Sequence, residues 1–283
     1  MSRMDYYKPT SLDEAWKLKK LIPGSRFIAG GTDILVKIKN REVSPPALIS
    51  LRSISELTGI QSGNVTRIGA MTTISELIQH RALAVKYPVL VEAAGRLGSV
   101  QIRNVATVGG NLCNCSPCAD TALPLLVLEA RVLLQSPGKE REVPLNEFFV
   151  GPGESCIAAG EILTAILLDR PAPDAQATSL KKGRVKMDLA IASVAALLEM
   201  DGKNCKKARL AAGSVAPVPL RLYQVEELLE NGPITKAKLA EAQKLAVKSI
   251  SPITDVRSTD NYRRQIVSVY VKRCLEKLMG GNP

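Results

Sequence analysis

Two stretches of the sequence share one pattern, in which an apolar run precedes two glycines and then short polar side chains. Residues 27–36 carry the glycine pair at positions 30 and 31, and residues 107–120 carry it at 109 and 110. Adjacent glycines leave the backbone bare, so its N–H groups can face a close ligand. We interpret each stretch as a strand ending in a glycine turn, the second leading into an apolar helix capped by Asp120 or Thr121. A glycine turn before a helix favours an anion such as a phosphate.

Neither stretch has the sequence of a known phosphate-binding fingerprint. Neither contains the GxGxxG pattern, and no Gly-Lys-Ser or Gly-Lys-Thr follows the glycines. A single glycine pair is usually an ordinary tight turn. Two pairs, each followed by polar residues, strengthen the hypothesis of a ligand site, and two ordinary turns are the alternative.

Three of the six cysteines lie in the second stretch, at Cys113, Cys115 and Cys118. Metal or redox use is more plausible for them than a disulfide framework. An iron–sulfur cluster normally takes four ligands, and Cys156 is the plausible fourth. Cys113 and Cys115 would point the same way in an extended segment, but nothing local brings Cys156 near. We therefore predict no metal and small buried thiols, with a cluster or a redox-sensitive thiol pair as alternatives.

The composition indicates a globular chain with one large or two modest domains. Its 283 residues have a mean hydropathy of +0.05 and no apolar run of about 18 residues, so we expect no membrane span. The first residues are charged and show no apolar signal segment, so the expected compartment is the cytoplasm. His80 is the only histidine, which excludes a His-based metal site and a Ser-His-Asp triad in this chain, and we expect it on a solvated helix face.

The basic character of the chain has two explanations. A net charge of +11 could serve nucleic acid, but the lysines and arginines are dispersed and aromatic residues make up only 4%. We therefore expect no nucleic acid, and a basic surface for acidic partner subunits or anionic nucleotides.

The elements that must position these residues divide the chain in two. Ser11 and Glu14 form a capping box, which predicts a helix over residues 12–21. The proline-rich segment 170–175 is the best linker, so we place a domain boundary near residue 175. Beyond it the sequence predicts a two-stranded hairpin and three helices, over 189–200 with 206–215, and over about 220–230, 235–249 and 261–279.

Several separate motifs together resemble the FAD-binding medium subunit of the molybdenum hydroxylases, the family of the bacterial xanthine, aldehyde and carbon monoxide dehydrogenases. The similarity covers nearly the whole chain and includes both glycine stretches. Its other motifs are residues 7–15, 153–163, 187–190 and 251–264, the last with Asp255, Arg257 and Tyr262-Arg263-Arg264.

The resemblance implies an α+β fold. Residues 1–175 would form an FAD-binding domain of the vanillyl-alcohol oxidase and p-cresol methylhydroxylase type, with subdomains over about 1–55 and 56–175. Residues 176–283 would form a C-terminal antiparallel sheet with helices. The positions that match FAD-binding residues of the family are Ile28, Ala29, Gly30, Gly31, Thr32, Asp33, Ile34, Leu97, Thr107, Gly109, Gly110, Asn111, Cys113, Asn114, Asp120, Leu163, Lys181 and Lys186.

The resemblance also implies a role in electron transfer. A molybdenum-binding large subunit with molybdopterin would oxidise the substrate, and a small subunit with [2Fe-2S] clusters would relay electrons to FAD here. The acceptor would be NAD(P)⁺ or another molecule, and the assembly a dimer of heterotrimers. No catalytic side chain is expected, because the flavin carries the chemistry.

Some features leave other interpretations open. Some members carry a tyrosine against the flavin ring where this chain has Leu189, so acceptor access cannot be copied from them. The basic residues from Lys181 to Lys186 could be a solvated loop instead of a flavin contact. The alternative functions are a stand-alone flavin reductase or oxidase of the same fold, such as the cell-wall enolpyruvyl reductase, and a flavin-free basic scaffold.

Overall fold

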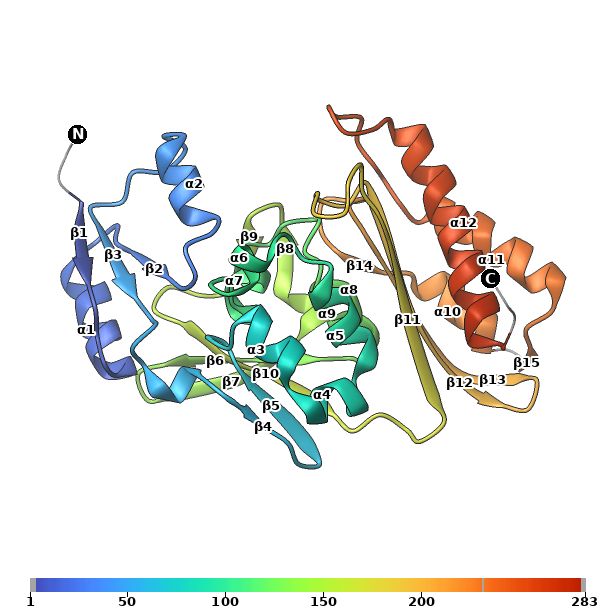
Figure 1. The fold of residues 1–283 in the computed structure, drawn as a ribbon, viewed down its shortest axis with the longest axis horizontal. Coiled ribbons are helices and arrows are strands. Elements are labelled where there is room, and N and C mark those ends of the chain that lie inside the picture. The colour runs from blue at the N-terminus through green and yellow to red at the C-terminus, as the bar shows by residue number, and fades with distance from the viewer. Residues whose placement is uncertain (1–3, 231, 281–283) are drawn as a thin grey trace.

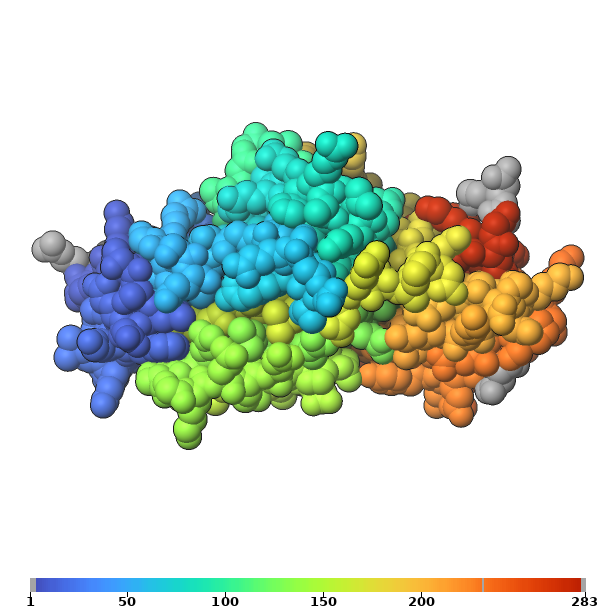
Figure 2. Space-filling view, turned by 90° about the horizontal axis from the view of Figure 1, so that it is seen from below, coloured from blue at the N-terminus to red at the C-terminus, as the bar shows by residue number. Residues whose placement is uncertain are grey.

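The computed structural model describes residues 4–230 and 232–280, and three bodies follow one another along its longest axis (Figure 1). Figure 2 shows the same order from another side, with the N-terminal and C-terminal parts at opposite ends. Helices and sheets mix in all three bodies, which confirms the predicted α+β class. Among the described residues, no helix combines the length and the apolar character needed to cross a bilayer.

The N-terminal subdomain is a small parallel sheet with the order β1, β3, β2. Its elements are β1 (Asp5–Tyr7), α1 (Leu12–Leu21), β2 (Arg26–Ile28), α2 (Ile34–Lys39) and β3 (Ala47–Ser50). Ser11 begins α1 by accepting a hydrogen bond from the backbone N–H of Glu14, so the predicted helix is confirmed. The sequence analysis missed β1, because three residues are too few to show alternation.

The central subdomain is built on a five-stranded antiparallel sheet with the order β4, β5, β10, β6, β7. The strands are β4 (Ile60–Gln61), β5 (Val65–Gly69), β6 (Arg131–Ser136), β7 (Lys139–Pro144) and β10 (Ile162–Asp169). Side chains alternate between its faces: Ile166 and Leu168 join the main core, whereas Ala165 and Leu167 form a smaller cluster on the other face.

Short helices cover the main-core face of this sheet (Figure 1). They are α3 (Ile74–Gln79), α4 (Arg81–Lys86), α5 (Pro88–Gly95), α6 (Val100–Arg103), α7 (Val108–Cys113), α8 (Ala122–Val127) and α9 (Leu145–Phe148). Three small elements complete the subdomain: η1 (Ser55–Leu57), β8 (Phe149–Gly151) and β9 (Glu154–Ser155).

In the C-terminal domain, an antiparallel sheet has its own helices on one face, and its other face packs against α5 and α8 of the central subdomain (Figure 1). Its elements are β11 (Ala175–Lys182), β12 (Ala192–Asp201), β13 (Asn204–Gly213), β14 (Leu220–Arg221), α10 (Tyr223–Glu230), β15 (Gly232–Pro233), α11 (Lys236–Lys248) and α12 (Asp260–Leu278). Ala195 and Leu197 face the central core, whereas Val194 and Ala196 pack toward α10, α11 and α12. Burial on both faces explains why β12 is apolar from Val194 to Leu198.

Two capping residues correct the sequence predictions. Thr107 has extended dihedral angles, and its hydroxyl accepts the N–H of Gly110 at 3.0 Å, so the second glycine pair starts α7. The predicted strand and turn at this position were wrong. His80 lies between α3 and α4, and its Nδ1 accepts the N–H of Leu83 at 3.4 Å. His80 is therefore the N-cap of α4, and the expectation that it lies on a solvated helix face was wrong.

The predicted bounds beyond the linker also need correction. β11 begins at Ala175, within residues that we interpreted as the end of a linker and a basic loop. This strand was not predicted, because its sequence has no apolar alternation. β12 starts at Ala192 instead of 189. Leu220 and Arg221 pair with β13, so α10 begins only at Tyr223.

A buried ion pair joins these late elements to the sheet. Glu226 of α10 and Arg221 of β14 have side chains that are each 6% exposed, and Nε and Nη2 of the guanidinium lie 2.6 Å from the two carboxylate oxygens. The same carboxylate accepts the backbone N–H of Leu210 in β13 at 2.8 Å. One side chain thus satisfies both a buried cation and a strand donor.

We expect Glu226→Ala to destabilise the protein by about 3 kcal/mol, because the buried Arg221 guanidinium loses both short contacts and keeps only Glu129 at 3.9 Å and the Leu126 carbonyl at 3.4 Å. Glu241→Ala is the control, since Glu241 pairs with Lys244 at 3.8 Å and both side chains are more than half exposed. Denaturant unfolding monitored by circular dichroism measures both. Equal losses for the two variants would contradict this account.

Candidate functional site

A cavity of about 770 Å³ opens between the N-terminal and central subdomains. Four segments far apart in the sequence supply most of its lining: β2 with the following turn and α2, the segment from Leu97 through α7 to Asp120, residues 153–163, and residues 187–189 of the loop between β11 and β12. The two glycine stretches predicted to form a ligand site therefore line the same cavity, although they lie at residues 27–36 and 107–120 of the sequence.

The first glycine pair presses against the backbone of the central subdomain. A Cβ on Gly30 would lie 2.0 Å from the carbonyl oxygen of Val105, a distance that no side chain can occupy. Gly31 has a φ of +80°, which also favours glycine. The residue types are thus imposed by the close approach of two chain segments at the cavity wall.

The backbone of this turn keeps its donors unused. In the described structure, the N–H groups of residues 30–33 donate no hydrogen bond to another protein group, although the carbonyls of Gly31 and Asp33 accept bonds from α2. Adjacent unpaired N–H groups at a cavity form a ready cradle for an anion. The turn at the N-terminal side of the cavity therefore has backbone donors that no described protein group uses.

The second glycine pair has a different role from the predicted one. The N–H of Gly109 donates to the carbonyl of Ala70 at 2.9 Å, and that of Asn111 donates to Thr107 at 2.9 Å. Together with the cap on Gly110, these bonds use the donors that we expected to face a ligand. Gly109 instead allows α7 to pack closely against Ala70, because an added Cβ would lie 2.7 Å from that residue.

A polar bridge crosses the cavity between the two stretches. The side-chain amide of Asn114 donates to Asp33 at 2.9 Å, and its oxygen accepts from the ammonium of Lys37, also at 2.9 Å. Lys37 lines the cavity but was not among the predicted residues. Its position four residues after Asp33 on a helix was the signal available in the sequence.

A second charged pair lies where the C-terminal domain meets the cavity wall. The ammonium of Lys181 in β11 is 2.8 Å from the carboxylate of Asp120, and the two side chains are 10% and 11% exposed. Burial raises the pKa of Asp120, and the lysine works against that rise. Lys181 also donates to the carbonyl of Arg96 at 3.3 Å, so it holds Asp120 in place from the neighbouring domain.

The cysteine triplet adopts a geometry that the sequence did not predict. Cys113 ends α7, and Cys115 has a left-handed φ of 46°, so the two are not in an extended segment. The carbonyl of Cys115 accepts the N–H of Gly153 at 3.1 Å, a bond that does bring the loop of Cys156 close. Both expectations about this region were wrong.

Two thiols of the triplet have raised pKa values. Cys113 is exposed at the cavity, so the expectation of a buried thiol is wrong for it, and desolvation by neighbouring protein atoms raises its pKa. Burial likewise raises the pKa of Cys115 to about 11, and its Sγ donates to the carbonyl of Leu112 at 3.3 Å. Within residues 4–230 and 232–280, no three His, Cys, Asp or Glu side chains are placed to hold a metal ion.

Most of the predicted site residues line this one cavity. They are Ile28, Ala29, Gly30, Gly31, Thr32, Asp33, Ile34, Leu97, Thr107, Gly109, Gly110, Asn111, Cys113, Asn114, Asp120 and Leu163. Lys181 lies behind Asp120, and Lys186 lies on the exposed loop outside the lining. The lining residues that the prediction omitted include Lys37, Met71, Ile102, Glu161, Met187 and Asp188.

Comparison with known proteins gives matches over nearly the whole chain. The model of the FAD binding domain in molybdopterin dehydrogenase matches residues 2–171, and the CO dehydrogenase flavoprotein C-terminal domain matches residues 180–278. The carbon monoxide dehydrogenase medium chain of Afipia carboxidovorans is 33% identical over 96% of this chain and 96% of its own. The xanthine dehydrogenase FAD-binding subunit of Escherichia coli O157:H7 is 30% identical over 96% and 94%.

Solved structures agree with these sequence matches. A chain of carbon monoxide dehydrogenase from Hydrogenophaga pseudoflava has a TM-score of 0.95 at 30% identity, with 98% of each chain covered. Quinoline 2-oxidoreductase from Pseudomonas putida 86 has a TM-score of 0.92 at 28% identity, with 98% of this chain and 97% of the other covered. The similarity includes all four segments that line the cavity.

We expect Gly30→Ala to destabilise the protein by about 3 kcal/mol, because the added methyl group must push the Val105 carbonyl away. Gly95→Ala is the matched control: nothing lies within 4 Å of its added Cβ, so it should cause no loss. Denaturant midpoints measure both variants. A Gly30→Ala protein as stable as the Gly95→Ala protein would refute the close approach.

Proposed function

The chain belongs to the FAD-binding subunits of the molybdopterin dehydrogenases, and on that premise we propose that it passes electrons from [2Fe-2S] clusters of a partner subunit through FAD to NAD(P)⁺ or another acceptor. The observation that carries this proposal is the cavity in which both glycine stretches meet, with unused N–H donors on one wall. FAD, when bound, supplies reversible electron transfer that protein side chains cannot provide.

The residues around the cavity fit such a cofactor. The N–H groups of residues 30–33 would hold the negative pyrophosphate. Gly30 and Gly109 let the backbone of the cavity wall pack closely against Val105 and Ala70, which fixes the position of both glycine stretches. Asn111 and Asp120 offer an amide and a carboxylate to ribose or ribityl hydroxyls, because both line the cavity.

The lining also has an apolar portion that suits a flat ring. Leu97, Leu163 and Leu189 belong to it, and Leu189 is half exposed at the mouth. These side chains exclude water and position the ring, and the charged pairs remain with the polar part of the cofactor. Because no side chain there must donate or accept a proton, the protein binds, orients and tunes the flavin.

We propose as partners a molybdenum-binding large subunit and a [2Fe-2S] small subunit, in a dimer of heterotrimers. The relatives support this, because their names describe a medium chain of carbon monoxide dehydrogenase and a subunit of xanthine dehydrogenase. The proposed compartment is the cytoplasm, which agrees with the finding that all six cysteines are free thiols.

The purified chain should show flavin absorption and release FAD on denaturation. Asn111→Ala and Asp120→Asn should each weaken FAD binding by about tenfold, because each removes a polar group at the cavity worth roughly 1–3 kcal/mol. Asn146→Ala is the control, since Asn146 donates to the hydroxyl of Tyr223 away from this cavity. Fluorescence titration of the apoprotein measures all three. A colourless chain that takes up no added FAD would end the proposal.

The native protein should purify with a larger molybdenum-containing chain and a smaller iron–sulfur chain. Native mass spectrometry with metal analysis of the complex would identify both. Partner association is expected because the similar proteins are named as a medium chain and an FAD-binding subunit of larger dehydrogenases. Recovery of the native protein only as a free monomer would contradict the proposed assembly.

A further inference from the structure

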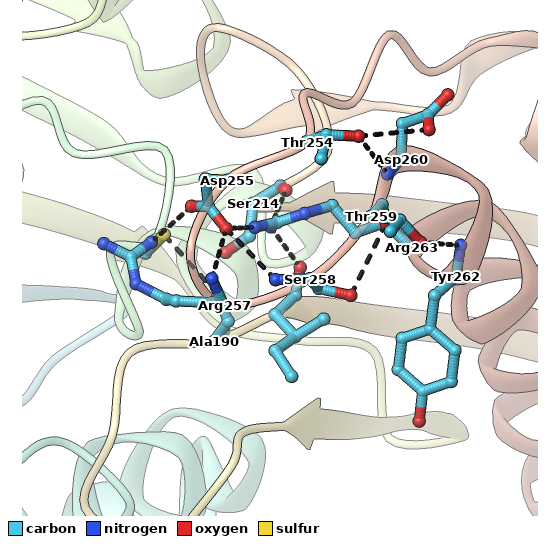
Figure 3. Close-up of polar contacts among 12 residues, drawn as sticks. Ala190, Ser214, Thr254, Asp255, Arg257, Ser258, Thr259, Asp260, Tyr262 and Arg263 are labelled. Carbon is cyan, nitrogen blue, oxygen red and sulfur yellow. Dashed lines mark hydrogen bonds and ion pairs between the residues drawn. The ribbon is translucent and has the colours of Figure 1, made fainter.

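The motif that begins at Asp255 has no role in the cavity itself, yet it forms the densest polar cluster at the cavity's C-terminal side. Arg263 of α12 is 2% exposed, so a full guanidinium charge is buried. Its Nη2 donates to Asp255 at 2.7 Å, and its Nη1 donates to the carbonyls of Ile191 at 2.6 Å and Ser214 at 2.9 Å. Figure 3 shows this guanidinium between Asp255 and Ser214.

The two carbonyls that Arg263 binds belong to residues at the base of a loop and next to the cavity wall. Ile191 is the residue at which the loop 183–190 returns to the sheet, because its N–H donates to the carbonyl of Lys182 across the base of that loop. Ser214 follows β13, and its N–H donates to Pro117 in the second glycine stretch at 2.8 Å. Arg263 therefore joins α12 to the base of the loop and to the wall of the cavity.

The loop held in this way reaches the cavity mouth. Its residues Met187, Asp188 and Leu189 line the cavity. Next to them, the carbonyl of Ala190 accepts a weak hydrogen bond from the Sγ of Cys118 at 3.7 Å, a contact that also appears in Figure 3. The base of the loop is thus fixed from two sides, by α12 and by the cavity wall.

A row of alternating charges continues from this base to the loop tip. Arg184 and Asp188 pair at 2.6 Å within the loop. Arg257 pairs with Asp255 at 3.2 Å and also acts electrostatically on Asp188. Burial alone would raise the pKa of Asp255, but the N–H of Arg257 and the Arg263 guanidinium outweigh it, so the carboxyl has a lowered pKa and stays ionised.

The arrangement is costly, which indicates a role beyond stability. The Nε of Arg263 and the Oγ of Ser214 are buried without a partner in the described structure. Ser214 also has a left-handed φ of 63°, which orients its backbone at this contact. A buried ion pair is weak evidence for stability alone, since apolar residues would serve as well.

We propose that Arg263 and Asp255 are positioning residues that clamp the loop 183–190 at the cavity mouth and thereby restrict the access of small solutes to the flavin. The shielding of the flavin rests on the proposed function, whereas the clamping of the loop does not. α12 thus controls a cavity to which it contributes no lining residue.

Trypsin tests the clamp, because the loop offers cleavage sites after Arg184 and Lys186. In Arg263→Lys and Asp255→Asn, cleavage there should be about tenfold faster, the effect of losing one charge-assisted hydrogen bond on local opening. Cleavage after Lys203, in the turn between β12 and β13, should keep the parent rate. Peptide mass spectrometry of the holoprotein follows both sites.

Arg264→Lys is the matched control. Arg264 neighbours Arg263 on α12 and also donates to two carbonyls, those of Val247 and Ile250, each at 3.1 Å, but at the end of α11 instead of the loop. Its loop cleavage should equal that of the parent. Equal loop cleavage in all the proteins, or equal acceleration in the control, would overturn the clamp.

Quenching of the bound-flavin fluorescence by iodide tests the shielding. The quenching constant should rise in Arg263→Lys and Asp255→Asn and stay at the parent value in Arg264→Lys. Faster loop cleavage with unchanged quenching would overturn the shielding role. A parent chain that binds no FAD would count against the proposed function, while the trypsin result would still decide the clamp.

Arg257→Gln keeps the clamp testable if both inner variants fail to fold. Its side chain is 27% exposed, so the substitution leaves no buried charge, yet it removes the contact with Asp255. Loop cleavage above the parent rate supports the proposal, and cleavage at the parent rate overturns it.

Discussion

The contact between Gly30 and the carbonyl of Val105 is the constraint on which the site depends. Two backbones meet there without a side chain between them, and this closeness sets the distance between the N-terminal and central subdomains. The subdomains also meet at the Asn114 bridge and in a buried cluster that includes Leu51, Met71 and Ile162, and the cavity lies between them. The unused N–H groups beside the contact then make the remaining space suitable for an anionic cofactor.

The C-terminal domain contributes to the site by support more than by lining. Lys181 holds Asp120 from β11, and Arg263 holds the loop base from α12, although neither lines the cavity. Both are buried cations, and Lys181 acts directly on a lining residue, whereas Arg263 binds the carbonyl of Ile191 next to the loop that carries lining residues 187–189. The binding surface is thus one layer of residues, and its geometry is set by a second layer on another domain.

The family resemblance predicted the fold class, and most of the site residues that it implied line the cavity, although other lining residues such as Lys37 and Met71 were not predicted. The sequence analysis failed where the outcome depends on distant contacts. The sequence could not show that the N–H of Gly109 donates to the carbonyl of Ala70, because only folding brings these two residues together. β11 was missed because its partner strand, and not its own pattern, makes it a strand. Lys186 was predicted from the family resemblance, yet it lies outside the residues that line the cavity.

The C-terminal sheet shares its two faces between two separate cores. Leu197 and Ala211 belong to the core of the central subdomain, whereas Leu198 and Leu210 belong to the core with α10, α11 and α12. A fragment that ended at the linker would leave one of these cores open to water, and so would the complementary fragment. The central subdomain and the C-terminal domain therefore depend on each other for burial, and recombination between relatives can exchange them only where this shared layer remains compatible.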